Sequence, residues 1–390
     1  MKRHYKILHC LRAPIGGLFR HVCDLAGQQA HEGHEIGIVC DAVTGDALTD
    51  ECLAEIGATC SLGVHRIKMS RQISFADATA YKQILALAKN LAVDILHGHG
   101  AKGGAYARLA ARSLKAASRP VRAFYTPHGG SLHFEPRSLK GRLFFTLERS
   151  LEPHTDGIIF ESAYSRRVYA GKIGEPACRW RIIPNGLHAH ELTPVEPNNG
   201  AADFVLVGEL RYLKGVDVLL RAFAQLSETS GARLVIVGDG PDRGAFEDLA
   251  VQHGIAATTV FTGAMPARDA FRMGRCLVMP SRAESFPYVV LEAGAGGLPM
   301  LLTDVGGIPE ITAETPVQLL KPGVVDPLAL AMQNFLEAPE SLQATAEILR
   351  SEIAQRYTVE GMAKSIDQFY QVSTDSHDGE SQHVSELIVH

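Results

Sequence analysis

Short apolar runs alternate with amphipathic segments along the chain, and the same succession occurs twice. Residues 5–11 (YKILHCL) and 35–41 (EIGIVCD) flank one helical pattern, and residues 203–210 (DFVLVGEL) and 233–241 (RLVIVGDGP) flank another. Continuous apolar runs of strand length, separated by helices, are typical of parallel sheets that helices cover on both faces. The pattern predicts an α/β protein with two such sheets.

The segment between the two halves, residues 182–203, is rich in Pro, Asn and Gly, as linkers are. We therefore expect a first domain over residues 1–195 and a second over residues 196–358. A helical pattern follows at about residues 359–373, and the polar residues 374–390 are expected to be disordered.

The composition fits this division. With 390 residues, 46% of them hydrophobic, the chain is long enough for two domains with buried cores. Its seven cysteines are scattered singly, which favours a reducing compartment over a disulfide framework or a zinc site. The sequence has neither an apolar stretch of about 20 residues nor a signal-peptide pattern, so we expect a cytoplasmic protein.

Charge is divided unevenly. Residues 1–188 contain 25 Lys and Arg against 16 Asp and Glu, a net charge of +9. Because the whole chain has 38 against 43, the remaining residues have 13 against 27, a net charge of −14. Basic clusters such as Arg66, Lys68 and Arg71 are either solvated surface or a face for anionic lipid headgroups or phosphate-bearing substrates.

Two carboxylates flank a predicted helix start in the stretch SRAESFPYVVLEAG. Glu284 lies in a loop after a strand, and Glu292 lies roughly 12 Å further on at about 1.5 Å per residue. The free N–H groups of the helix start, near Phe286 and Pro287, stand between them and favour a phosphate. The arrangement suits a sugar nucleotide, with one acid on the sugar and the other on the ribose; the alternative is two surface acids on an amphipathic helix.

Other loops after predicted strands also carry candidate groups. Arg211 and Lys214 would neutralise a departing diphosphate, or are solvated loop charges. His128 ends a strand ahead of two glycines, a position that favours function over packing. Glycine pairs in two loops would let the backbone approach a ligand, or only form turns: Gly16 with Gly17, and Gly306 with Gly307.

Together these motifs resemble the retaining glycosyltransferases of family 4, whose GT-B architecture has two Rossmann-like domains facing across a cleft. The resemblance extends over nearly the whole chain. It rests on GG at Gly16, HG at His128, IPNG at Asn185, KG at Lys214, GDGP at Gly238 and E-x7-E at Glu284 and Glu292.

The resemblance implies a role for each position. Glu292 would bind the ribose, Glu284 the donor sugar, Lys214 the diphosphate, and His128 the sugar from the opposite domain; the late helix would cross back to the first domain. Further positions are assigned to donor binding: Gly16, Gly17, Gly208, Gly238, Phe286, Pro287, Gly306 and Gly307. The acceptor side is assigned His99, which otherwise simply packs, and Lys102.

One position departs from the family pattern. The family often has an arginine after the glycine at Gly208, whereas this chain has Glu209, so we interpret Arg211 as its replacement. The expected enzyme transfers a hexose from a UDP- or GDP-sugar to a hydroxyl acceptor with retention, without metal or cofactor. Attack is expected on the front face, with the leaving phosphate taking the acceptor proton.

The expected acceptor is a saccharide or lipid-linked saccharide of bacterial surface polysaccharide, exopolysaccharide or lipopolysaccharide assembly. We also expect peripheral contact with an anionic membrane at its inner face, and no nucleic-acid partner. Two alternatives stay open: a metal-dependent hydrolase that uses His97 and His99, and a nucleotide-sugar-binding protein without catalysis. The glycine spacing after residues 233–237 fits a dehydrogenase poorly.

Overall fold

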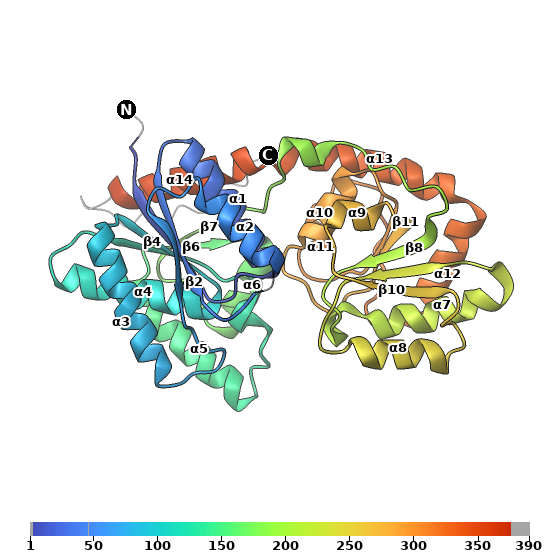
Figure 1. Cartoon of the computed structure of the whole chain (residues 1–390), viewed down its shortest axis with the longest axis horizontal. Coiled ribbons are helices and arrows are strands. Elements are labelled where there is room, and N and C mark those ends of the chain that lie inside the picture. The colour runs from blue at the N-terminus through green and yellow to red at the C-terminus, as the bar shows by residue number, and fades with distance from the viewer. Residues whose placement is uncertain (1–2, 46, 376–390) are drawn as a thin grey trace. The chain divides into compact units, whose positions relative to one another are not determined.

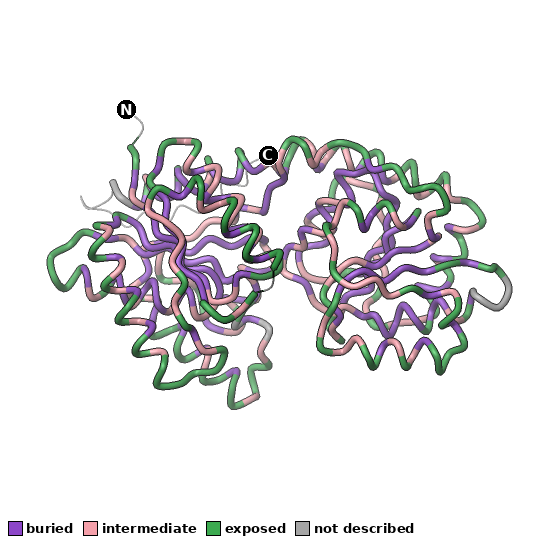
Figure 2. The backbone as a smooth tube through the Cα atoms, in the orientation of Figure 1, coloured by how far each residue is buried: buried purple, intermediate pink, exposed green. Residues whose placement is uncertain are grey.

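The computed structural model describes residues 3–45 and 47–375. It consists of two compact units, each an α/β layer structure (Figure 1). Unit 1 comprises residues 1–185 together with 359–390, and unit 2 comprises residues 186–358. The strands are buried along most of their length and the helices expose their outer faces (Figure 2). This is the arrangement expected of parallel sheets covered by helices.

Unit 1 contains a parallel sheet with the strand order β3-β2-β1-β4-β5-β6-β7. Its strands are β1 (Lys6–Leu11), β2 (Glu35–Asp41), β3 (Gly63–Ile67), β4 (Ile95–His99), β5 (Arg122–Thr126), β6 (Gly157–Phe160) and β7 (Arg179–Ile182). Its helices are α1 (Gly16–His31), α2 (Ala47–Gly57), α3 (Ala76–Leu91), α4 (Gly100–Ala116), α5 (Leu139–Leu151), α6 (Ala163–Lys172) and α14 (Val359–Asp375), with 3-10 turns η1 (Gly130–His133) and η2 (Glu152–His154).

Both faces of this sheet are covered because alternate residues of its central strands are apolar on either side. On one face, Ile7 packs in a core with Val22 of α1 and Ile366 of α14. On the other face, Leu8 packs in a core with Ala107 of α4. Helix α14 therefore supplies part of the core of the N-terminal unit.

Unit 2 contains a second parallel sheet with the strand order β10-β9-β8-β11-β12. Its strands are β8 (Ala202–Val207), β9 (Leu234–Val237), β10 (Thr259–Gly263), β11 (Gly274–Met279) and β12 (Met300–Leu302). Its helices are α7 (Val216–Ser230), α8 (Arg243–Gln252), α9 (Ala267–Phe271), α10 (Tyr288–Ala295), α11 (Ile308–Thr312), α12 (Val325–Glu337) and α13 (Pro339–Arg356), with 3-10 turns η3 (Ala189–Leu192) and η4 (Tyr212–Lys214).

The two sheets share one topology. In each, the first strand lies in the middle, the next two extend to one side, and the fourth begins the other side. The order therefore reverses between β1 and β4 in unit 1 and between β8 and β11 in unit 2. In open parallel sheets, ligands bind at the carboxyl ends of the strands at such a switch point.

The structure corrects the expected domain boundary. The chain divides between Asn185 and Gly186, not after residue 195, because Leu187 and Val195 already pack in the core of unit 2. A Pro- and Asn-rich composition thus marks irregular backbone rather than the point where contacts change. Helix α14 extends to Asp375, two residues into the segment expected to be disordered, and residues 376–390 of that segment lie outside the described residues. In the part of the chain that is described, no helix combines the length and apolar character that a membrane span requires.

Candidate functional site

Lys214 and Glu284 form an ion pair at the switch point of unit 2. Lys214 ends η4, which follows β8, and Glu284 lies in the loop that follows β11. Nζ of Lys214 lies 2.7 Å from Oε1 of Glu284, and the hydroxyl of Ser281 donates to the same oxygen at 2.7 Å. Two groups predicted separately from the sequence thus meet where this sheet topology places ligands.

The two loops are held together by further contacts. Gly215 has a φ of 70°, and a Cβ there would lie 2.0 Å from the carbonyl oxygen of Pro280, so this approach requires glycine. Arg282 donates through Nη1 and Nη2 to the two carboxylate oxygens of Asp217, at 2.7 and 2.8 Å. This hydrogen-bonded pair raises the pKa of the Arg282 guanidinium. The position of Lys214 is therefore fixed from both sides of its turn.

Arg211, which we interpret as the replacement for the family's arginine, lies beside Glu209, the residue that stands in that arginine's position. Its Nη1 is 3.6 Å from Oε2 of Glu209, and the Arg211 side chain is 44% exposed. Such an exposed pair holds its members weakly, which leaves the guanidinium able to turn to another anion.

The loop before α10 is held in place by packing and by the loop after β12. The side chain of Phe286 is 5% exposed and packs against Tyr357, with ring centroids 5.6 Å apart, so its ring belongs to the core of unit 2. Gly307 donates its N–H to the carbonyl of Ser285 at 2.7 Å, and a Cβ at Gly306 would lie 2.1 Å from the carbonyl oxygen of Glu284. These two glycines therefore form the turn that holds the Glu284 loop.

The remaining donor-side positions differ in what surrounds them. Gly238 has a φ of 138°, and a Cβ there would lie 1.9 Å from the carbonyl oxygen of Gly208, so the GDGP turn packs directly on the loop after β8. Glu292 lies in α10 and is half-buried, and Pro287 is the residue before that helix. Gly16 and Gly17 begin α1, belong to unit 1 and are exposed.

Five histidines gather at the switch point of unit 1. Strands β1 and β4 pair His9 with His97, and the rings of His97 and His99 lie 4.1 Å apart. His21 of α1 and His128, in the loop after β5, face each other with ring centroids at 4.7 Å. The alternation of β4 places both of its histidines on the face that α1 and α14 cover.

A series of hydrogen bonds joins these histidines to α14. The carboxylate of Asp367 at its end sets the direction in which each bond is donated. Asp367 can only accept, so the amide nitrogen of Gln29 donates to it at 2.8 Å, and Oε1 of Gln29 accepts from Nε2 of His9 at 3.0 Å. Nδ1 of His9 then accepts from Nε2 of His99 at 3.1 Å, and Nδ1 of His99 accepts from Nε2 of His128 at 3.1 Å. Each ring is thereby assigned one neutral tautomer.

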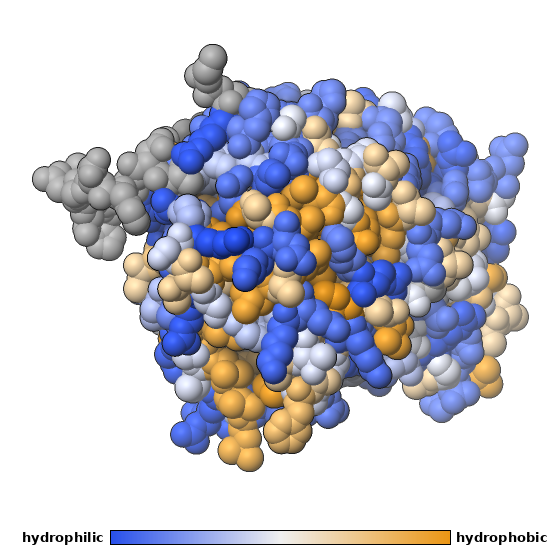
Figure 3. Space-filling view, turned by 60° about the vertical axis from the view of Figure 1, so that its left-hand side comes forward, coloured by the Kyte–Doolittle hydropathy of each residue, from blue (hydrophilic) through white to orange (hydrophobic). Residues whose placement is uncertain are grey.

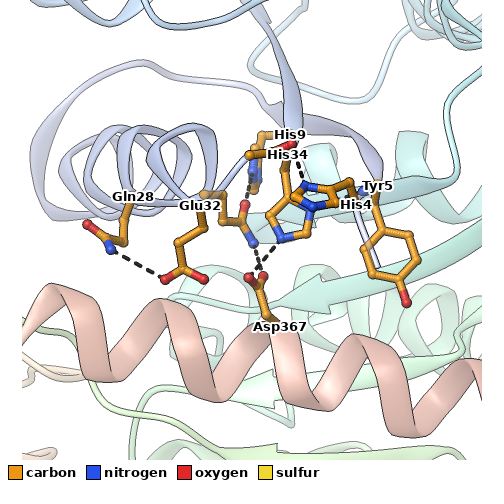
Figure 4. Close-up of polar contacts among 9 residues, drawn as sticks. His4, Tyr5, His9, Gln28, Glu32, His34 and Asp367 are labelled. Carbon is orange, nitrogen blue, oxygen red and sulfur yellow. Dashed lines mark hydrogen bonds and ion pairs between the residues drawn. The ribbon is translucent and has the colours of Figure 1, made fainter. Parts of the chain in front are cut away.

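The Asp367 carboxylate, at one end of this series of hydrogen bonds, is held by two partners (Figure 4). His34 accepts the backbone N–H of Tyr5 on Nδ1 at 3.0 Å, so its Nε2 carries the proton that it donates to Asp367 at 2.9 Å. Both carboxylate oxygens of Asp367 are thus in use, one for His34 and one for Gln29. Figure 4 shows the His34 ring directed at the carboxylate of Asp367, which projects from α14.

Burial keeps the histidines of this cluster neutral. Desolvation lowers the pKa of His9 and of His21 to about 4, although the hydrogen bonds that these rings donate to Gln29 and Asn185 act in the opposite sense. Desolvation and neighbouring imidazoles lower the pKa of His97, His99 and His128 well below the usual value. At neutral pH the imidazoles of this cluster are therefore uncharged and act as hydrogen-bond donors and acceptors.

His128 is the member of the cluster closest to solvent. It is partly exposed, and its φ of 50° is left-handed, a conformation that costs free energy in a residue with a side chain. Gly129 follows with a φ of 74°. Strained backbone held by its surroundings is often found where a side chain must be aimed at a ligand.

The two residues assigned to the acceptor side have other partners. His99 is 1% exposed, and both of its ring nitrogens are hydrogen-bonded to other histidines. This agrees with the alternative interpretation, that His99 simply packs. Nζ of Lys102 lies 2.6 Å from Oδ1 of Asp77 and 2.7 Å from the carbonyl oxygen of Gln72. His99 thus has no ring nitrogen left for an acceptor, and Lys102 has two of its three N–H groups engaged.

Unit 1 also has an exposed apolar surface. A groove of about 300 Å³ lies between α3, α4 and α5, lined among others by Ile73, Tyr81 and Leu147. Beside it, α5 exposes Leu139 and Leu143, by 84% and 51%. Apolar side chains gather on the side of unit 1 that is turned forward in Figure 3.

Arg66, the first member of the expected basic cluster, is engaged elsewhere. Its Nη1 donates to Asp50 at 2.7 Å, and its other nitrogens donate to the carbonyls of Asp41 and Thr44. These contacts fix the loop after β2, so the guanidinium is less available to a lipid headgroup than sequence spacing suggested.

Sequence reasoning missed several residues of both sites. In unit 2 these are Ser281, Asp217 and Arg282, which orient or brace the Lys214–Glu284 ion pair. In unit 1 they are His9, His21, Gln29, Asn185 as a side chain, and Asp367. One signal was available: His9 interrupts an apolar strand, and a polar residue inside a fully buried run needs a partner.

Comparison with known proteins agrees with this geometry. The family described as Glycosyltransferase Family 4 matches residues 15–191, and the family described as Glycosyl transferases group 1 matches residues 192–351. Glycogen synthase of Mycobacterium tuberculosis is 28% identical over 237 residues, which are 59% of this chain and 57% of that protein. D-inositol 3-phosphate glycosyltransferase of Rhodococcus opacus is 32% identical over 193 residues, 46% and 42% of the two chains. The chain thus spans about half the length of the curated relatives it matches.

Solved structures match over more of the chain. HepE of Anabaena, solved in complex with UDP-glucose, has a TM-score of 0.79 at 17% identity, covering 95% of this chain and 100% of that one. Sucrose-phosphate synthase of Thermosynechococcus elongatus has a TM-score of 0.78 at 19% identity, covering 95% and 99%. The fold is the GT-B fold of two Rossmann-like units, and the chain belongs to glycosyltransferase family 4.

Proposed function

We propose that this protein transfers a sugar from a nucleotide-sugar donor, a UDP- or GDP-sugar, to a hydroxyl group of an acceptor, with retention at the anomeric carbon and without a metal ion. The observation that carries the proposal is the Lys214–Glu284 pair at the switch point of unit 2. Structural neighbours solved with UDP and with UDP-glucose support a nucleotide-sugar donor.

The ion pair suits the departure of a diphosphate. An ammonium has three N–H groups, and Glu284 takes one from Lys214, so the others can meet phosphate oxygens. Charge on the leaving diphosphate grows as the glycosidic bond breaks, and a cation already held in place stabilises that charge without reorganising. Arg211, on the same loop, is proposed to add a second cation.

Glu284 is proposed to orient the donor sugar. Among the described residues, both of its hydrogen bonds go to Oε1, which leaves Oε2 for a sugar hydroxyl. Glu292 is proposed to bind the ribose, and His128 to contact the donor sugar through the ring that the histidine chain orients. In the absence of a carboxylate assigned as a nucleophile, we propose front-face attack, with the leaving phosphate accepting the acceptor proton.

A panel of UDP- and GDP-sugars tests the proposal, with release of nucleoside diphosphate as the readout. We expect turnover of at least one donor, undiminished by EDTA, and its loss in Glu284→Gln. Binding of a donor without turnover would indicate a nucleotide-sugar-binding protein. Activity that disappears in EDTA and returns with one divalent ion would contradict the metal-free mechanism.

We propose further that the acceptor is a lipid-linked or surface saccharide met at the inner face of a bacterial membrane. The support is the outer surface of α5, where exposed Leu139 and Leu143 alternate with exposed Lys140 and Arg142. A helix with leucines and cations on its exposed side is suited to the boundary between acyl chains and anionic headgroups.

A further inference from the structure

Three histidines of unit 1 are placed as the ligands of a metal ion would be. His21, His99 and His128 can each offer one ring nitrogen such that all three lie within 4.8 Å of one another. Nδ1 of His99 and Nε2 of His128 are already 3.1 Å apart. Two nitrogens bound to one tetrahedral zinc ion at about 2.0–2.1 Å are separated by about 3.3 Å, so this pair needs almost no movement.

His21 supplies an unused nitrogen. Its Nδ1 lies 2.9 Å from Oδ1 of Asn185, an oxygen that only accepts, so Nδ1 carries the proton and Nε2 has a lone pair. That Nε2 is buried, and it has no hydrogen-bond partner among the residues that the structure describes. Since His21 is 1% exposed, water does not readily compensate. A buried acceptor without a donor, facing two other imidazoles, is a position where a cation is stabilised.

The outer nitrogens of two of the three rings are held as they are in known metal sites. A metal-binding histidine usually donates its other N–H to a carbonyl oxygen or another fixed acceptor, which sets the ring orientation. His21 donates Nδ1–H to Asn185, and His99 donates Nε2–H to Nδ1 of His9. Only His128 must change, by moving its proton from Nε2 to Nδ1, and the single bond lost is the one between His99 and His128.

A second group, His9, His97 and His99, meets the same distance criterion but is less suitable. All six of its ring nitrogens have partners, which include Gln29, Thr126 and Tyr370. A metal ion there would leave several buried groups unpaired. This group is also buried throughout, whereas His128 is partly exposed and gives the first group a path from solvent.

We infer that His21, His99 and His128 bind one zinc ion, with an exchangeable fourth position for water. Neutral imidazole is the ligand that zinc, nickel and copper share, and three imidazoles without a carboxylate disfavour magnesium and calcium. The site is inhibitory rather than catalytic, because zinc would occupy the ring nitrogen by which His128 is held in the histidine chain. That consequence for activity rests on the proposed function, whereas the binding site itself does not.

Metal binding to the full chain tests the site directly. Co²⁺, added to protein freed of metal by EDTA and dialysis, should give the visible ligand-field bands of a low-coordinate nitrogen site without a thiolate charge-transfer band. Zinc should displace it at one equivalent. His21→Ala and His128→Ala should each weaken binding by about 100-fold or more, since each removes one of three ligands.

A matched control comes from unit 2, where the exposed His190 stacks beside His188 at 5.6 Å and would be the obvious surface site. His190→Ala should bind zinc as the unchanged protein does. Equal affinity of the unchanged chain and His21→Ala would overturn the inference, and so would the absence of stoichiometric binding.

X-ray absorption of the zinc complex of the unchanged chain keeps the test independent of variant folding. Three nitrogen ligands at about 2.0 Å support the site, and sulfur at about 2.3 Å would contradict it. Inhibition of transfer by zinc, relieved by EDTA, is then measured separately. Zinc that binds at these histidines without inhibiting would count against the role proposed for His128 and leave the metal site standing.

Discussion

Asp367, on α14, and His128, in the loop after β5, stand at opposite ends of one directed series of hydrogen bonds. The direction is set by the carboxylate, because it accepts at both oxygens. The proton position on His128 is therefore decided by a residue 239 positions further along the chain.

The change Asp367→Asn should reverse this series. His34 can only donate, so the asparagine oxygen must face it and the asparagine NH₂ must face Gln29. The side-chain amide of Gln29 then rotates so that its oxygen and nitrogen exchange places, and His9, His99 and His128 each adopt the other tautomer. We expect nitrogen NMR of labelled protein to show His128 protonated on Nε2 in the unchanged chain and on Nδ1 in the variant.

The same change should also lower the free energy of unfolding, by about 1–3 kcal/mol, since it weakens buried hydrogen bonds to a charged group. Trp180, the single tryptophan, lies in β7 of unit 1 and reports on that unit. Glu360→Gln, at an exposed position of α14, should change neither the tautomer nor the stability. An unaltered His128 tautomer in Asp367→Asn would refute the directed series.

Lys214→Ala should lower kcat by roughly 100-fold or more, because the charge that Lys214 meets grows during bond breaking. Donor KM should change less. Lys321→Ala, at an exposed position of unit 2, serves as the control and should leave both constants unchanged. A loss confined to KM would assign Lys214 to ground-state binding instead.

Glu292→Ala should mainly raise the KM for the donor, since a ribose contact is made equally in the ground and transition states. Steady-state kinetics with varied donor measure the effect. The exposed Glu314 offers a control acid in the same unit. If kcat falls as strongly as in Lys214→Ala, the division of roles between these two residues is wrong.

Acidification should destabilise unit 1 over a defined range. In the unfolded chain histidine titrates near pH 6.5, whereas burial lowers the pKa of His9 and His21 to about 4. Between these values the unfolded state binds protons that the folded state does not, so stability falls as the pH falls. Each residue contributes up to about 1.4 kcal/mol per pH unit.

Urea unfolding followed by Trp180 emission, with EDTA present throughout, measures this slope. The stability that these histidines contribute should be complete above about pH 7 and decline steadily below pH 6.5. A stability that is level between pH 6.5 and 5 would show that the imidazoles are protonated in the folded state.

Leu143→Glu should reduce binding to vesicles rich in anionic lipid, because it places a carboxylate on the exposed surface of α5. Leu330→Glu, a leucine 59% exposed on α12 of unit 2, is the matched control. Sedimentation at low and at physiological salt should show binding that weakens with salt. Equal binding of both variants, or no preference for anionic over neutral vesicles, would remove α5 from the proposed membrane contact.

The sequence predicted most of the fold because buried parallel strands are continuous apolar runs, and the loops after them carry the polar residues. Lys214 and Glu284 were each found in this way. Their pairing was not, since 70 residues separate them and no local pattern encodes such a contact. Arg282 went unnoticed for the same reason, although it lies only two residues before Glu284.

The histidine cluster was less predictable. The alternation in HGHG placed His97 and His99 on one face, but His21 lies on a helix and Asp367 more than 260 residues beyond His99 in the chain. Helical spacing shows only which residues face inward; it does not show what they meet there. The directed hydrogen bonds follow from atoms that the fold alone brings together.

The return of α14 to the first unit has a consequence for biosynthesis. On the ribosome, unit 2 has all of its residues once Thr358 has emerged, whereas unit 1, translated first, still lacks the helix that covers Ile7 and the carboxylate that holds the histidines. Unit 1 therefore cannot complete its core until α14 has emerged, after all of unit 2. N-terminal domains generally fold first during synthesis, whereas here the residues that complete the N-terminal unit are translated after those of the second unit.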